Sequence, residues 1–188
     1  MEIRPTKKGY RPGELRTAFF DSRFGNTLIA VEPETKRIVW LSLVLDKSAK
    51  AKKDNLEELE IHWQPETLNE NGVDEFFDKP PGNWIFEDGC VGLKLFMKGT
   101  EFQHEVWNAL RKIPKGETRS YSEVAEQLVR PKNHARAVAS AVASNTIAVL
   151  VPCHRVIQSS GKISGFRWGP ARKRMLLDWE AAATQNAV

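Results

Sequence analysis

The hydrophobic pattern of the chain changes once along its length, near Gly99, and this change limits the folds that the chain can adopt. Before Gly99, short apolar runs alternate with turn signals, which is typical of strands joined by tight connections. After it, apolar residues recur at helical spacing. The sequence therefore predicts an α+β protein with two domains. Residues 1–97 are expected to form an antiparallel sheet and residues 98–188 a mostly helical domain.

The first half contains three well-marked strands. Because they follow one another at short spacing, we expect an antiparallel meander. The strands are residues 15–20, 27–31 and 37–45, with shorter candidates at 84–86 and 93–96. The remaining segments are a loose leader at 1–14, a charged connection at 46–53 and short helices at 55–61 and 73–77.

The second half carries clear signals for helix starts. Two pairs have the spacing of a capping box, in which two side chains satisfy the free N–H groups of the first turn. The pairs are Thr100 with Gln103 and Ser120 with Glu123. Asn133 is expected to cap a third helix over residues 134–143, and Pro170 to begin the last helix. Two short helices across a tight turn are typical of a helix-turn-helix, although any αα-hairpin shows this pattern.

The third helix has an unusual composition. Its side chains are nearly all small, and Arg136 is its only long charged residue. Two explanations stay open. The helix packs closely against a neighbouring element, or it approaches DNA closely and Arg136 reaches into the duplex.

The formal net charge of +4 is unevenly distributed along the chain. Residues 1–97 carry a net charge of −3, and residues 98–188 carry +7. The basic half suits a polyanion such as nucleic acid, although a well-solvated surface would also explain it.

The chain has 2 cysteines, Cys90 and Cys153, and no Cys-x-x-Cys spacing, so neither a thiol–disulfide motif nor a metal site is expected. Cys90 lacks basic neighbours that would activate it, which favours a structural role. So few cysteines fit a reducing compartment. The charged N-terminus is not a secretory signal, and no apolar run approaches the roughly 20 residues of a membrane span. We therefore expect a soluble, cytoplasmic protein that makes no contact with membranes.

Cys153 lies in an apolar stretch, residues 147–157, and is followed directly by His154 and Arg155. A free cysteine among apolar residues often acts only as a small buried hydrophobe. Cationic neighbours favour the thiolate, which is the nucleophilic form. The stretch is therefore a candidate site for a reactive thiol.

The sequence from Pro152 to Val156, Pro-Cys-His-Arg-Val, resembles the active-site signature of the methylated-DNA–protein-cysteine methyltransferases, or O6-alkylguanine-DNA alkyltransferases. The resemblance extends over about residues 99–180, through Ile-Pro-Lys-Gly-Glu-Thr at 113–118, Arg-Ala-Val at 136–138 and Ser-Gly-Phe-Arg-Trp-Gly at 164–169. Residues 1–97 fit the family's N-terminal domain, which is ribonuclease H-like, by length and strand content.

The resemblance implies a single-turnover DNA repair protein without a cofactor. It would flip O6-alkylguanine, mainly O6-methylguanine and also O4-methylthymine, out of duplex DNA and transfer the alkyl group to Cys153. His154 would act through a water as the base, and Glu180 would orient that imidazole, as in a catalytic triad. Asn145 would brace the turn that presents the cysteine.

The resemblance also implies the contacts with DNA. Tyr121 would help to rotate the nucleotide, and Arg136 would fill the gap left in the base stack. The implied base-contacting residues are Tyr121, Arg136, Val156, Phe166 and Arg167. The implied DNA-contacting residues are Ser120, Tyr121, Ala135, Arg136 and Ser140. The family binds in the minor groove, largely without sequence preference, and we expect a monomer, with cooperative binding left open.

Two positions depart from the commonest family pattern. The side chain of Phe166 cannot donate a hydrogen bond, and Arg167 replaces a small hydroxyl residue, so the backbone is expected to make the contacts to O6 there. Three alternatives remain: a cysteine hydrolase, a non-catalytic sensor of alkylated DNA and a helix-turn-helix DNA-binding protein. Adjacent Cys153 and His154 would diverge on an extended chain, which argues against a hydrolase dyad.

Overall fold

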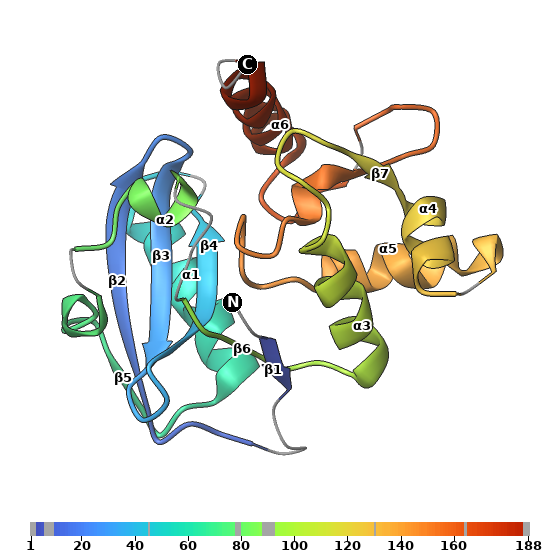
Figure 1. The fold of residues 1–188 in the computed structure, drawn as a ribbon. Coiled ribbons are helices and arrows are strands. Elements are labelled where there is room, and N and C mark those ends of the chain that lie inside the picture. Colours follow the sequence, from blue (N-terminus) through green and yellow to red (C-terminus); the bar gives the residue numbers. More distant parts are fainter. Residues whose placement is uncertain are drawn as a thin grey trace. The chain divides into compact units, whose positions relative to one another are not determined.

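The computed structural model describes residues 3–5, 10–44, 46–77, 80–87, 93–129, 131–163 and 165–185. The chain divides into two compact units, Met1–Lys98 and Gly99–Val188. A mixed sheet dominates the first unit and helices dominate the second (Figure 1). The predicted α+β class is therefore confirmed.

The N-terminal unit contains a six-stranded sheet in the order β1-β6-β4-β3-β2-β5. The strands are β1 (Ile3–Pro5), β2 (Glu14–Ser22), β3 (Gly25–Glu32), β4 (Arg37–Leu43), β5 (Thr67–Asn69) and β6 (Leu95–Met97). The antiparallel meander is confirmed for β2, β3 and β4. The prediction of a wholly antiparallel sheet is wrong, because β1 and β4 pair with β6 in parallel, as β5 does with β2. These short strands are reached through longer connections, which allow parallel pairing.

Helix α1 (Ala49–Trp63) packs against this sheet and completes its core. It is longer than predicted, because the Ser48 hydroxyl accepts a hydrogen bond from the Ala51 N–H and starts the helix within the expected connection. Leu59 and Trp63 are fully buried on its inner face, in a cluster with Trp40 and the apolar side chains of β2 and β3.

Other N-terminal predictions need correction. The expected strand at 84–86 is a short helix, α2 (Trp84–Glu87), because the turn that precedes it closes helically, with the Ile85 N–H bonded to the Gly82 carbonyl. The expected helix at 73–77 shortens to a 3₁₀ turn, η1 (Asp74–Phe76). The leader is not wholly loose, since it contains β1. Cys90 lies outside the described residues.

The C-terminal unit consists of helices around a very short parallel pair of strands. Its elements are α3 (Glu101–Leu110), β7 (Arg119–Ser120), α4 (Tyr121–Gln127), η2 (Lys132–His134), α5 (Ala135–Ala143), η3 (Cys153–Arg155), β8 (Val156–Ile157) and α6 (Pro170–Gln185). Both predicted capping boxes are confirmed, at the starts of α3 and α4. The predicted Asn133 cap is wrong, because the turn η2 carries the chain into α5 and His134 is the cap residue, without a side-chain hydrogen bond.

The two faces of α5 have different surroundings. Val138, Ala141 and Val142 are buried, and the indole N–H of Trp107 on α3 donates to the Ala141 carbonyl over 2.8 Å. The opposite face, which includes Arg136, is exposed. The small residues therefore allow close packing on one face. On the other face they leave a surface with few protruding side chains.

Candidate functional site

Cys153 is held at the start of a tight turn. The preceding residues 147–152 are buried, and the Cys153 N–H bonds to the Val151 carbonyl over 2.8 Å. The 3₁₀ turn η3 follows directly, with the Arg155 N–H bonded to the Pro152 carbonyl over 3.0 Å. The thiol is only 3% exposed. The chain thus presents one nearly buried sulfur at a fixed place.

The side chain of Asn145 braces this turn. Its amide group donates to the carbonyls of Ile147 and Val151 over 3.2 and 2.9 Å, and to the Cys153 sulfur over 3.1 Å. Its oxygen accepts from the Ile147 N–H over 2.9 Å. The resemblance implied such a brace, and the structure places Asn145 in direct contact with the thiol.

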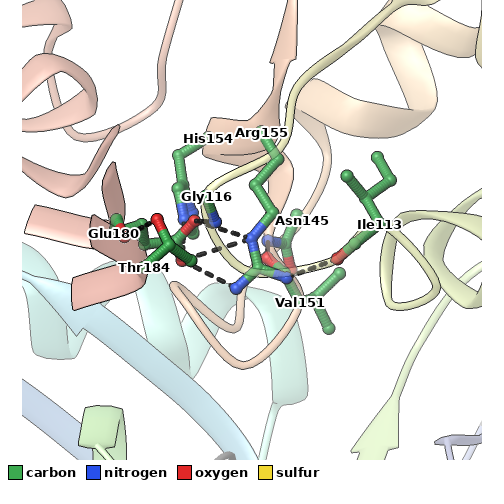
Figure 2. Close-up of polar contacts among 8 residues, drawn as sticks. All are labelled: Ile113, Gly116, Asn145, Val151, His154, Arg155, Glu180 and Thr184. Atoms are coloured by element: carbon green, nitrogen blue, oxygen red, sulfur yellow. Dashed lines mark hydrogen bonds and ion pairs between the residues drawn. The ribbon is translucent and has the colours of Figure 1, made fainter. Parts of the chain in front are cut away.

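Glu180 of α6 faces both His154 and Arg155, as Figure 2 shows. Its carboxylate bonds to His154 Nε2 over 2.9 Å, to Arg155 Nη2 over 2.6 Å and to Arg155 Nε over 2.9 Å. The Gly116 N–H adds a bond of 3.2 Å. Burial alone would raise the pKa of Glu180, but the bonds and charges of His154 and Arg155 outweigh it and lower that pKa to about 2. The carboxylate is therefore ionised at neutral pH.

His154 is fully buried, which lowers the pKa of its imidazole against the opposing influence of Glu180. A neutral imidazole that bonds to a carboxylate through Nε2 carries its proton there, which leaves Nδ1 with a free lone pair. Nδ1 is buried and has no hydrogen-bond partner within the described part of the chain. The geometry thus provides a base oriented by Glu180.

No hydrogen bond joins His154 to Cys153 among the described residues. This agrees with the expectation that adjacent side chains diverge. Direct proton transfer between them, as in a hydrolase dyad, therefore has no support from the geometry.

Burial raises the pKa of the Cys153 thiol to about 11, against the opposing influences of Asn145, Lys173 and Arg167. Lys173 of α6 is itself fully buried, and its ammonium donates to the Val156 carbonyl over 2.6 Å. Burial lowers the pKa of Lys173, and the nearby Cys153 opposes this. A positive charge is thus held inside the unit, where it favours the thiolate.

A cavity of about 390 Å³ opens onto the thiol. Its lining residues are Tyr121, Ala139, Val142, Ala143, Cys153, Gly165, Phe166 and Arg167. Burial raises the pKa of the Tyr121 hydroxyl, and a negative charge on Cys153 raises it further. The phenol therefore stays protonated at neutral pH and can donate a hydrogen bond. The volume lies within the range of about 300–1,000 Å³ that is typical of small-molecule sites.

The other predicted contact residues lie elsewhere in the unit. Val156 is buried and does not line the cavity. Ser120 caps α4, and its hydroxyl accepts from the Glu123 N–H. Ala135, Arg136 and Ser140 lie on α5, where Arg136 and Ser140 are exposed and Ala135 is half-buried. Among the described residues, no three His, Cys, Asp or Glu side chains gather as a metal site would require.

The family model for the 6-O-methylguanine DNA methyltransferase DNA binding domain matches residues 101–182. A methylated-DNA–protein-cysteine methyltransferase of Candida glabrata is 32% identical over 186 residues, which cover 92% of this chain and 89% of that relative. This chain belongs to the methylated-DNA–protein-cysteine methyltransferase family. A second relative, the bifunctional transcriptional activator/DNA repair enzyme Ada of Escherichia coli, is 53% identical over 94 residues. That match covers 50% of this chain and only 26% of the relative.

The likeness between this methyltransferase and solved structures extends over both units. The crystal structure of Mycobacterium tuberculosis OGT in complex with DNA is 35% identical, with a TM-score of 0.66, and the match covers 90% of this chain and 93% of that one. In the part of the methyltransferase that the structure describes, no helix has the length and apolar character needed to cross a membrane.

One residue of the methyltransferase site, Lys173, was missed by sequence reasoning. The sequence shows it beside Arg172 and Arg174, so it reads as one of several solvated charges at the start of a helix. Its spacing carried the signal, because Lys173, Leu176 and Glu180 are the buried residues of α6 and lie at i, i+3 and i+7. A lysine and a glutamate on the apolar stripe of a helix indicate buried charges with a function.

Proposed function

We propose that the protein repairs DNA by moving an alkyl group from O6 of guanine to Cys153, once per molecule. One observation carries this proposal: a single thiol lies on the wall of a base-sized cavity, beside an imidazole that a buried carboxylate orients. O6-methylguanine is the proposed main substrate and O4-methylthymine a second one. No cofactor takes part.

The first step forms the thiolate. A thiol with a pKa of about 11 is almost wholly protonated at neutral pH, so a base must remove the proton as the reaction proceeds. We assign this role to His154, acting through one water, because Nδ1 has a free lone pair and no direct bond to the sulfur. Glu180 stabilises the imidazolium that forms, and Lys173 stabilises the thiolate.

The second step is an in-line displacement at the alkyl carbon. The Cys153 sulfur forms a bond to that carbon, the bond from carbon to O6 breaks, and its electron pair passes to the base. Tyr121, which lines the cavity, donates a hydrogen bond to the departing guanine. The guanine takes up the proton that His154 removed from the thiol. The product is a thioether, which water does not hydrolyse, so the protein acts once.

We further propose that α4 and α5 act as a helix-turn-helix on the minor groove, largely without sequence preference. The exposed face of α5, with Ser140 and the half-buried Ala135 beside it, has short side chains that allow the helix to approach the DNA closely. Arg136 is its long side chain. Ser120 and Tyr121 at the start of α4 contact the DNA in this arrangement. The reactive carbon is inaccessible in stacked DNA, so the nucleotide must be flipped out.

The finer features of the fold and setting are proposals of the same kind. We assign residues 1–97 to a ribonuclease H-like supporting domain and residues 98–188 to the domain that binds DNA and transfers the alkyl group. We propose a monomeric, cytoplasmic protein. A non-catalytic sensor of alkylated DNA, or a plain helix-turn-helix protein, would not need the arrangement of Asn145, His154 and Lys173 around a thiol.

The test is the intact mass of the protein after incubation with duplex DNA that contains O6-methylguanine. We expect one added methyl group per molecule, located on the peptide that contains Cys153. A second duplex with O4-methylthymine tests the wider substrate range.

Two variants make this test specific. Cys153→Ser is expected to lose all transfer, and Cys90→Ser, which removes the other cysteine of the sequence, is expected to keep it. Turnover beyond one equivalent, or a methyl group that persists in Cys153→Ser, would contradict the mechanism. Binding of the alkylated duplex without transfer would favour the sensor.

A further inference from the structure

The cavity beside Cys153 has an unusual charge for a site that receives a neutral alkylated base. Arg167 is the one cation among its described lining residues, and no carboxylate lines it. The other lining residues are small, apolar or aromatic, apart from Tyr121 and the thiol itself. A neutral methyl group offers a guanidinium no charge to pair with at this place.

Arg167 is placed by a short turn rather than left on a loose loop. The Gly169 N–H bonds to the Phe166 carbonyl over 2.9 Å, which closes the turn around Arg167. Trp168 is buried, and its ring meets that of Phe166 edge-on, with centroids 5.2 Å apart. Neighbours on both sides are therefore anchored, and Arg167 itself is exposed at the cavity.

The charge of Arg167 also reaches the reacting sulfur, since it opposes the rise in the pKa of Cys153 that burial causes. The second cation that acts on the sulfur, Lys173, differs in position. Lys173 is buried, bonds to the Val156 carbonyl and does not line the cavity. Arg167 is thus the cation that a group attached to the base would meet.

A negatively charged adduct poses a particular problem for a thiolate. When the sulfur attacks a carbon that carries a carboxylate, two negative charges approach within a few ångströms in a desolvated cavity, where their repulsion is strong. A guanidinium offsets this repulsion and can hold the carboxylate with two parallel hydrogen bonds.

We propose that Arg167 adapts the site to O6 adducts that carry a carboxylate, of which O6-carboxymethylguanine is the simplest. This proposal rests on the proposed function. The Cys153 sulfur forms a bond to the methylene carbon, and the bond between that carbon and O6 breaks. Its electron pair stays on the base, which takes up the thiol proton and becomes guanine. Cys153 becomes S-carboxymethylcysteine, and no oxidant or further reactant is needed.

The test compares two adducts of nearly equal size and different charge. Duplexes with O6-carboxymethylguanine and with neutral O6-carbamoylmethylguanine are each mixed with excess protein, and single-turnover rate constants are measured. The quantity of interest is the ratio of the two rate constants, because intrinsic differences in reactivity cancel between protein variants. We expect Arg167→Gln to lower this ratio roughly tenfold, the effect of losing one hydrogen bond to a charged group.

Two further variants serve as controls. Arg167→Lys keeps the charge and is expected to retain part of the ratio. Arg174→Gln removes the same charge from an exposed position on α6 that does not line the cavity, and is expected to leave the ratio unchanged.

The outcomes separate this inference from the proposed function. If Arg167→Gln slows both adducts equally, the guanidinium serves DNA or base binding in general, and the inference is overturned. If wild-type protein transfers no group even from O6-methylguanine, the proposed function itself fails. Methyl transfer with an unchanged ratio would overturn the inference alone.

Discussion

The two units of the protein bury very different interiors. The core of the N-terminal unit is a continuous cluster of aliphatic and aromatic side chains that includes Trp40 and Trp63. The C-terminal unit buries His154, Lys173 and Glu180 as well as the thiol of Cys153. Burying such groups costs free energy unless they are paired, so the second interior is not explained by folding alone. In the proposed mechanism these groups serve the chemistry of Cys153.

A pair of buried glutamates, Glu32 and Glu180, makes the contrast specific. Glu32 at the end of β3 is 1% exposed, and burial raises the pKa of its carboxyl despite a hydrogen bond from Thr35. Glu180 is equally buried, but the bonds from His154 and Arg155 lower its pKa to about 2. Burial therefore disfavours the ionised form of Glu32, whereas the interactions with His154 and Arg155 stabilise that of Glu180.

The largest effect is expected when the Glu180 carboxylate is replaced by an amide, and the same change at Glu32 is the comparison. Glu180→Gln leaves the half-buried Arg155 and the buried His154 against an amide, so we expect a loss of about 3 kcal/mol in the free energy of unfolding at pH 7. The imidazolium of His154 also loses its partner, so transfer should slow by a factor of roughly 100 or more. Glu32→Gln should change stability by less than about 1 kcal/mol, since it removes a charge that burial disfavours. Urea unfolding and single-turnover kinetics measure both.

The contributions of Glu180 and Glu32 to stability should change in opposite directions with pH. The folded pKa of Glu180 lies below its ordinary value of 4.5, so its stabilisation is complete above pH 4.5 and is lost as the pH falls towards about 2. The difference in stability between wild type and Glu180→Gln should shrink over that range. The folded pKa of Glu32 is raised, so its contribution is present below pH 4.5 and is lost as the pH rises through that pKa. A difference for Glu180→Gln that grows on acidification would contradict the assignment.

The same contrast explains what the sequence could and could not predict. The strands β2 to β4 and the caps of α3 and α4 follow from interactions between residues close in sequence, and they were predicted. The strands β1 and β5 were not predicted, and the strand expected at 93–96 was found as β6 without its parallel pairing being foreseen, because such pairing depends on the path of the whole chain. The helix at Trp84–Glu87 was missed because a short apolar run fits either structure.

The residues of the candidate site also differ in whether their local sequence marks them. Cys153 was marked by its own neighbours in the sequence. Glu180 contacts His154 across 26 residues, and only the resemblance to a family connected the two. Lys173 contacts Val156 across 17 residues and was overlooked, because patterns are read on the assumption that charges are solvated. Helical spacing could have marked Lys173 and Glu180 as buried, but their distant partners lie beyond sequence patterns alone.

A smaller effect is expected from Arg136, the long side chain on the exposed face of α5. If it fills the gap left by the flipped base, Arg136→Ala loses part of the few kcal/mol that extrusion requires, and transfer from duplex DNA should slow roughly 30-fold. Transfer from the free base O6-methylguanine should change little, since no stack has to open.

The matched control for Arg136 is Lys53→Ala, which removes an exposed charge from the N-terminal unit. It should alter neither reaction. An equal loss on duplex and free base in Arg136→Ala would show that the arginine acts on the cavity rather than on the DNA.

The smallest expected effect separates two lysines, one from each unit, that bond to backbone carbonyls. Lys98 donates to the carbonyls of His62 and Trp63 at the end of α1, each over 3.1 Å, and burial lowers its pKa. Lys173 donates to Val156 and adds a positive charge near Cys153. Lys173→Met should raise the pKa of the thiol further and slow transfer roughly tenfold, as a shift of about one pKa unit implies. Lys98→Met should weaken only the end of α1.

The pH–rate profile is the measurement that tells these lysines apart. Loss of the Lys173 charge makes the thiolate harder to form, so the rising limb of the profile should move to higher pH, and Lys173→Arg should restore part of the shift. Lys98→Met should leave the profile in place while lowering the midpoint of unfolding. If both variants lower stability and neither moves the profile, the buried lysine of α6 only supports the fold. The contrast between a structural and a chemical interior would then rest on His154 and Glu180 alone.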